Sequence, residues 1–143
     1  MLIAHVLHDK GEAVHALPAN ATLQQAAQEL LDKRVGALVV LDAEGALMGV
    51  FSERDLVREV ARLGPAALTQ EVGAAMTRHV ITADPSETLH DCLSRMTDRR
   101  VRHLPIMEAD RLIGIVSIGD LVKHCIAAAE AESAALQAYI AAQ

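Results

Sequence analysis

The strongest constraint on the fold is an internal repeat. Residues 49–55 (GVFSERD) return 65 residues later as residues 114–120 (GIVSIGD). Earlier in the chain, residues 14–18 align with residues 80–84 at an offset of 66. The offset falls to 65 because the second unit has one residue fewer in the turn between its next two strands. Self-similarity over a whole unit of this length marks a duplicated supersecondary unit. The chain is therefore predicted to be a tandem duplication.

Each unit has the order β-α-β-β-α. Apolar periodicity predicts a helix over residues 22–33 and another over 87–99, for example through Leu23, Leu30, Leu89 and Met96. Asn20 and Ser86 are predicted to cap these helices. The expected strands are residues 13–17, 37–41 and 47–51 in the first unit, and residues 79–83, 104–107 and 112–116 in the second.

The closing helix of each unit begins at a serine, Ser52 or Ser117. Leu63-Gly64-Pro65 carries two helix-stop signals and ends the first closing helix. The fold class is thus α+β, with a short N-terminal helix. The predicted division is residues 1–66 for the first repeat, 67–126 for the second and 127–143 for a C-terminal helical extension.

The C-terminal extension continues the last helix. Ile126, Ser133, Leu136 and Ile140 lie near one face of it, and Glu130 and Glu132 are expected to be solvated. Two interpretations remain open: the helix packs on its own domain, or it forms the seam of a dimer.

Composition excludes several classes of function. The chain has 143 residues, of which 52% are hydrophobic and 22% charged, as in a folded protein. It has one Phe, one Tyr and no Trp, and its net charge is −6, so neither stacking platforms nor a basic face favour nucleic-acid binding. No apolar segment approaches the roughly 20 residues that span a bilayer. A cytoplasmic protein without membrane contact is expected, with Cys92 and Cys125 as reduced thiols and no metal site.

The Ser-x-x-Asp motifs, Ser52/Asp55 and Ser117/Asp120, allow two interpretations. One is a capping box, in which the serine caps the helix and the acid three residues on reaches back. The other is a ligand site, since a helix N-terminus that presents a Ser and an Asp suits a phosphate or a ribose. The two roles can coexist in one residue.

The tandem unit resembles a pair of cystathionine-β-synthase (CBS) domains, also called a Bateman module. The resemblance rests on the repeated Gly-apolar-apolar-Ser-x-x-Asp joint and on residues 50–58 (VFSERDLVR) and 101–106 (VRHLPI). It covers about residues 1–125. It implies that the two CBS repeats pack with pseudo-twofold symmetry, sheet on sheet, and leave two clefts that can each hold an adenosine-containing ligand. Many family members then form disc-like dimers.

The resemblance also implies roles for individual residues. Asp55 and Asp120 would accept the ribose hydroxyls, since a carboxylate presents two acceptor oxygens. Ser52 and Ser117 would meet the ribose or the α-phosphate. The positions expected around adenine or along the cleft walls are Val14, Ala16, Val35, Gly36, Ala37, Val50, Ile81, Thr82, Val101, Leu104, Pro105 and Ile115.

The two clefts are expected to differ on the phosphate side. Arg102 and His103 are assigned to the Asp120 cleft, which makes it the stronger site for an anionic nucleotide. Arg54 is the candidate phosphate contact in the Asp55 cleft, with Lys10 as a weaker one.

The expected function is a regulatory sensor that binds AMP, ADP or ATP, or NAD(H) through its AMP half. An S-adenosylmethionine sensor and a ligand-free dimerisation or scaffold module are the alternatives. A non-enzyme is expected, because neither motif is followed by an identifiable base. The expected partners are a second copy of the chain and an unidentified regulated protein.

Overall fold

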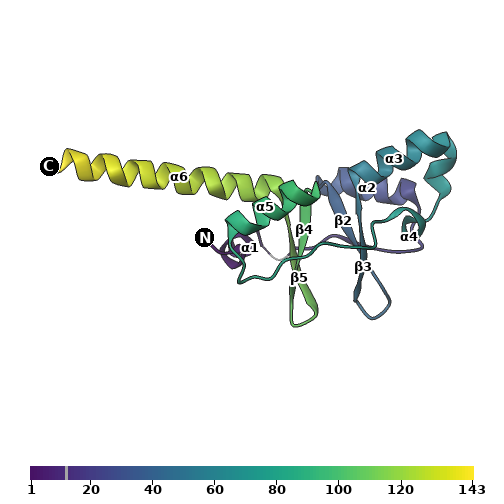
Figure 1. Cartoon of the computed structure of the whole chain (residues 1–143). Coiled ribbons are helices and arrows are strands. Elements are labelled where there is room, and N and C mark those ends of the chain that lie inside the picture. The colour runs from purple at the N-terminus through teal and green to yellow at the C-terminus, as the bar shows by residue number, and fades with distance from the viewer. Residues whose placement is uncertain (12) are drawn as a thin grey trace.

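The computed structural model describes residues 1–11 and 13–143. The first repeat contains β1 (Ala16–Pro18), α2 (Leu23–Lys33), β2 (Ala37–Leu41), β3 (Leu47–Ser52) and α3 (Glu53–Leu63). The second contains α5 (Leu89–Arg99), β4 (His103–Glu108), β5 (Arg111–Ser117) and α6 (Ile118–Ala141). The chain also forms α1 (Ile3–Lys10) before the first repeat, and η1 (Gly64–Thr69) and α4 (Val72–Ala75) between the repeats. The predicted α+β class is confirmed (Figure 1).

The first repeat has the predicted order, but the second lacks its first strand. In the first sheet β1 runs parallel to β2, and β2 pairs antiparallel with β3. The second sheet contains only the antiparallel pair β4 and β5. The prediction of a strand over residues 79–83 is wrong, because only Ala83 bridges to Ile106 there.

Pro105 explains the missing strand. In the first repeat, the backbone N–H of Val39 donates to the carbonyl of His15 next to β1, at 3.1 Å. The repeat offset places Pro105 at the position of Val39, and proline has no N–H to donate. The parallel ladder of the second repeat loses that bond and shrinks to one bridge.

The helix caps lie two residues later than predicted. Thr22 and Thr88, rather than Asn20 and Ser86, accept hydrogen bonds from the N–H groups of the third helical residues. Ser86 instead donates its hydroxyl to Asp84 within the preceding turn, at 2.6 Å. A serine that is satisfied locally in a turn is not free to cap the helix.

The two repeats have separate cores. The segment before the first repeat packs in the core of the second repeat, and the segment between the repeats packs in the core of the first. Ile3, Val6 and Leu7 of α1 are buried in the core of the second repeat. Ala67, from η1, and the buried residues of α4 belong to the core of the first repeat. Chain order and core membership therefore differ, and this exchange ties the two repeats together.

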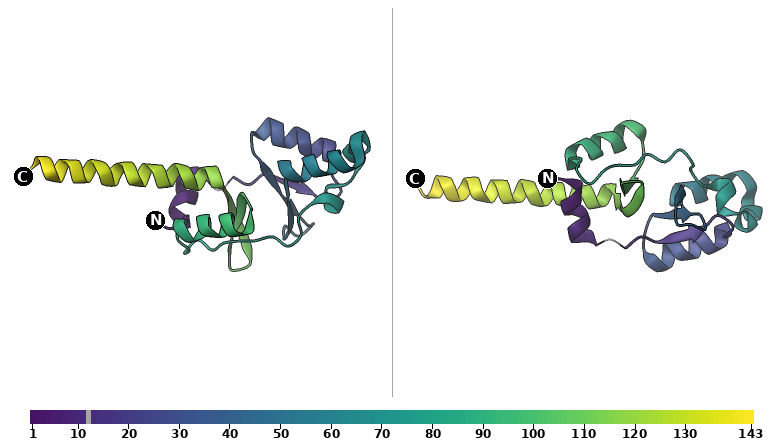
Figure 2. Two further views of the ribbon diagram at one scale, coloured as in Figure 1. Left: turned by 45° about the horizontal axis from the view of Figure 1, so that its top comes forward. Right: turned by 90° about the horizontal axis from the view of Figure 1, so that it is seen from below.

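The outer part of α6 leaves the body of the protein. Residues 125–141 are exposed throughout, and the helix projects as a single rod (Figures 1 and 2). The interpretation that this helix packs on its own domain is wrong. Within residues 1–11 and 13–143, no helix combines the length and the apolarity needed to cross a membrane.

Candidate functional site

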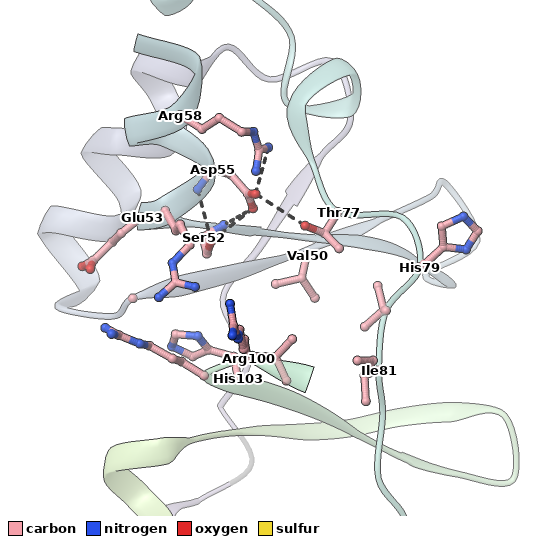
Figure 3. Close-up of a pocket in the computed structure, with 15 residues that line it drawn as sticks. Val50, Ser52, Glu53, Asp55, Arg58, Thr77, His79, Ile81, Arg100 and His103 are labelled. Carbon is pink, nitrogen blue, oxygen red and sulfur yellow. Dashed lines mark hydrogen bonds and ion pairs between the residues drawn. The ribbon is translucent and has the colours of Figure 1, made fainter. Parts of the chain in front are cut away.

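A cleft of about 240 Å³ lies between the two repeats, at the joint of β3 and α3 (Figure 3). The first repeat supplies the Ser52–Asp55 turn, together with Gly36, Val50 and Arg58. The other wall comes from two short segments of the chain after the first repeat. These are Thr77 with His79, Val80 and Ile81, and Arg100 with Val101, Arg102 and His103.

Ser52 and Asp55 form a complete capping box. The hydroxyl of Ser52 accepts from the N–H of Asp55 at 3.3 Å. In return, Asp55 Oδ2 accepts from the N–H of Ser52 at 2.9 Å and from its hydroxyl at 3.1 Å. Ser117 and Asp120 repeat the box at the start of α6. The capping interpretation is therefore confirmed for both motifs.

Asp55 is held from its other oxygen as well. Oδ1 forms an ion pair with Arg58 Nη2 at 3.0 Å and accepts from the hydroxyl of Thr77 at 3.4 Å. The residue is only 4% exposed. A carboxylate offers about four lone-pair sites, so these four contacts use its capacity. A ribose can reach Asp55 only by sharing or replacing the contacts of Arg58 and Thr77.

The cleft is rich in cations. Arg54, Arg58, Arg100 and Arg102 line it, whereas its acids are Glu53 and Asp55. Asp55 is already paired with Arg58, so three arginines and one acid, Glu53, remain in the lining. Such a surround favours an anionic ligand.

His103 lies at the meeting point of the repeats. A Cβ atom added to Gly36 would stand 3.1 Å from His103 Nε2, so glycine permits this close approach. Burial lowers the pKa of His103, and the positive charge of Lys10 adds to that effect. The imidazole is therefore neutral near pH 7 and can serve as a hydrogen-bonding group rather than a charge.

The cations are thus distributed in the opposite way to the sequence expectation. Arg102 and His103 line the cleft that contains Asp55, and not one built around Asp120. Lys10, expected in the Asp55 cleft, pairs with Asp120 at 2.6 Å. The cause is the crossed construction of the module. The Ser-x-x-Asp joint of the first repeat faces the strand start of the second, and α1 joins the second repeat.

Asp120 is the more accessible carboxylate, with 27% of its side chain exposed. Its Oδ2 accepts from the N–H of Ser117 at 2.8 Å and from Lys10, whose ammonium also donates to the carbonyl of Ile115 at 2.8 Å. Partial burial raises the pKa of Asp120, but the bonds from Lys10 and Ser117 outweigh it and leave the pKa below its usual value. A second hollow beside Asp120 lies between α1 and α6 and is lined by Asp9, Lys10, Lys123, His124 and Ala127.

The remaining predicted residues divide into two groups. Gly36, Val50, Ile81 and Val101 line the Asp55 cleft with the residues named above. The others lie outside the lining of both hollows. Three of them are buried: Ala37, Leu104 and Pro105. Val35 packs on the core of the first repeat, and the carbonyl of Thr82 accepts a hydrogen bond from Arg95. Val14 and Ile115 are half-buried, and Ala16 is exposed.

Sequence reasoning missed several lining residues. Arg58 could have been found, because it stands three residues after Asp55 and so shares its helix face. Thr77 gave no such signal, since the repeat offset sets it opposite Gly11. Arg100 follows the last residue of α5 in a left-handed backbone conformation, with a φ of 54°, and its place in the cleft lining was not predicted.

Comparisons with known proteins agree with this architecture. The family model described as "CBS domain" matches residues 11–62 and 71–127. A CBS-domain protein from Agrobacterium tumefaciens is 41% identical, has a TM-score of 0.84, and aligns over 85% of this chain and 91% of its own. The mitochondrial CBS domain-containing protein CBSX3 of Arabidopsis thaliana is 32% identical over 96% of this chain and 71% of its own length. A CBS domain protein from Pyrobaculum aerophilum, solved in complex with AMP, is 27% identical with a TM-score of 0.74, over 84% of this chain and 89% of its own.

Proposed function

The chain belongs to the CBS-domain family, and from that premise we propose that it is a regulatory module that binds an adenosine-containing ligand. The observation that carries the proposal is the cleft between the repeats. It brings a Ser-x-x-Asp turn, an apolar wall and several arginines to one place. The match to the family indicates no catalytic domain, so a regulatory role is preferred to an enzymatic one.

In the Asp55 cleft, each part of such a ligand has a matching surface. The ribose hydroxyls would reach Asp55 and Ser52, in exchange for the contacts of Arg58 and Thr77. The base would lie against the apolar wall of the cleft, which contains Val50, Ile81 and Val101. The phosphates would extend toward Arg54, Arg100 and Arg102, also in that lining.

We propose AMP as the first ligand to test. The Pyrobaculum aerophilum relative was solved with AMP. The cationic lining also suits ADP, ATP or the AMP half of NAD(H). S-adenosylmethionine is less well suited, because its sulfonium cation would gain nothing from the arginines. The Asp120 motif would form a second site, in which Lys10 stands as a counter-ion.

Ligand binding would act by bridging the repeats. A nucleotide in the Asp55 cleft would contact α3 of the first repeat and residues 77–103 of the second. It would thus favour the arrangement in which both walls contact the ligand. The cleft of about 240 Å³ is smaller than the 300–1,000 Å³ usual for small-molecule sites, so binding is expected to widen it. The resulting shift would be transmitted to a regulated protein, and a coupling of about 1–3 kcal/mol is enough for such a signal. The proposal includes a homodimer and a cytoplasmic setting.

Isothermal titration calorimetry with AMP, ATP, NADH and S-adenosylmethionine tests the proposal. AMP or ATP should bind with a dissociation constant below about 1 mM. Arg102→Gln should weaken ATP binding about tenfold, as expected for the loss of one charge-assisted contact. Arg99→Gln is the matched control, since Arg99 lies outside the cleft lining, and it should leave the affinity unchanged.

The ligand-free scaffold is the competing function. It predicts that none of the four compounds binds at millimolar concentration, and that Ser52 and Asp55 act only as a cap. Equal weakening by Arg102→Gln and Arg99→Gln would also contradict the proposed site, because it would reduce the effect to general charge.

A further inference from the structure

The outer part of α6 carries a heptad repeat that the ligand site does not use. Apolar or small residues recur along it at alternating steps of four and three. This spacing has a period of 3.5 residues, which is the period of a coiled-coil seam rather than of a straight helix on a globular core. The six seam positions are Val122, Ile126, Ala129, Ser133, Leu136 and Ile140.

The other faces of the helix are sorted just as clearly. Every Val, Ile and Leu between residues 122 and 140 stands in the seam. The positions that face away from it are alanines from residue 127 onward, at residues 127, 128, 131, 134, 135, 138, 141 and 142. The two acids, Glu130 and Glu132, flank the seam on its two sides, as charged residues do in coiled coils. The alanines favour the helix itself, and the seam is left to provide the contact.

Nothing in the described part of the chain covers this seam. Val122 is 42% exposed, and Ile126, Leu136 and Ile140 are 54%, 55% and 68% exposed. Their heptad spacing sets these side chains along one line of α6, whose outer part projects from the body (Figure 2). A contiguous apolar stripe of this kind marks a contact surface.

We propose that a second copy of this chain covers the seam, with residues 122–140 forming a parallel, two-stranded coiled coil. A heptad seam requires a partner helix with the same period, and the same helix of a second copy supplies it in register. Isoleucine at the first core position of the heptad, as at Ile126 and Ile140, with leucine at the second, as at Leu136, favours two strands. Ser133 interrupts the apolar core with one polar layer, which helps to fix the register.

The flanking charges select the parallel orientation. An antiparallel pair that keeps all six layers would centre on residue 131, so Glu130 would face Glu130 of the second copy and Glu132 would face Glu132. In the parallel pair, a residue on one flank meets the residue five positions later in the other helix, and a residue on the opposite flank meets the residue five positions earlier. Glu132 then lies beside Gln137, and Glu130 beside Cys125, so no acid faces an acid. This proposal does not depend on the ligand site.

Disulfide trapping in the full-length chain tests both the contact and its orientation. In a Cys125→Ser background, Ser133→Cys places two thiols in the same core layer of a parallel pair, at a spacing that a disulfide can bridge. Mild oxidation should then give a covalent dimer on non-reducing electrophoresis. The matched control is Ala131→Cys on the outward face, which should link at least about tenfold more slowly. Equal rates for the two variants would overturn the proposal, and so would an antiparallel pair, which sets residue 133 opposite residue 129.

A second comparison shows whether the seam holds the pair together. Ile126→Glu with Leu136→Glu adds two acids to the seam, whereas Ala128→Glu with Ala135→Glu adds two acids to the outward face. In the Ser133→Cys background, the seam pair should abolish trapping and the outward pair should leave it unchanged. All four positions are exposed, so neither pair is expected to unfold the body. Trapping that survives the seam pair would overturn the proposal.

Discussion

Replacing Asp55 by asparagine should destabilise the fold more than the same change at Asp120. Asp55 is 4% exposed. Its two oxygens accept hydrogen bonds from Ser52 and Thr77 and form an ion pair with Arg58. An asparagine has one acceptor oxygen and one donor group. If the oxygen turns toward Ser52, the amide NH₂ meets the guanidinium of Arg58. If it turns toward Arg58, the cap at the start of α3 loses its acceptor.

The contacts set the expected size of the effect. Loss of a charge-assisted hydrogen bond costs about 1.5–3 kcal/mol, and loss of a cap about 0.5–2 kcal/mol. The ion pair with Arg58 adds less, because Arg58 is 55% exposed and can be hydrated. We therefore expect Asp55→Asn to lower the free energy of unfolding by about 2 kcal/mol. Asp120→Asn changes a more solvated carboxylate, with a side chain 27% exposed against 6% for Asp55, and should cost about 1 kcal/mol or less.

Urea denaturation at pH 7, followed by circular dichroism at one protein concentration, measures both losses. For a chain of this size, the difference should also appear as a gap of a few degrees between the melting temperatures. If Asp55→Asn costs no more than Asp120→Asn, the four contacts on Asp55 do not carry the stability that their burial implies.

Further predictions concern the glycines, the thiols and the second carboxylate. In urea denaturation, Gly49→Ala should lower the free energy of unfolding by about 1–3 kcal/mol, because the new Cβ meets the backbone carbonyl of Thr77 at 2.7 Å. Gly114→Ala should lower it less, because its Cβ meets a movable methyl of Leu7 at 2.6 Å, and equal losses would contradict this. Iodoacetamide at pH 8 should label the exposed Cys125 and spare Cys92, whose pKa burial raises to about 11, and intact mass gives the count; labelling of both without denaturant would contradict this. Folding lowers the pKa of Asp120, so its charged form stabilises the fold fully above the ordinary value of 3.8, and this contribution is lost as pH falls through the folded pKa. The difference in free energy of unfolding between the wild type and Asp120→Asn should therefore close below pH 3.8.

The sequence predicted the repeat architecture well because apolar periodicity and the duplicated motif are local features. Helices and strands of the first repeat follow from them directly. The missing strand of the second repeat depends on one absent N–H at Pro105, whose effect appears only once the neighbouring strand is in place.

The site residues were predicted less evenly, for a related reason. Ser52, Asp55 and Val50 lie in the motif itself and were found. The positions of Lys10 and Arg102 depend on how the two repeats exchange segments in space. The repeat offset matches equivalent residues in the two copies, but it does not tell which copy faces which cleft. Tertiary contact, rather than local pattern, decided that assignment.

A methyl NMR titration with AMP tests the central claim most directly. The account predicts that the methyl signals of Val50, Ile81 and Val101 shift in proportion to bound AMP. The signals of Ile126 and Ile140, on the projecting helix, should stay unchanged. Saturating AMP that leaves the three cleft methyls unmoved, or that moves only Ile115 beside Asp120, would contradict the claim that the Asp55 cleft binds the ligand.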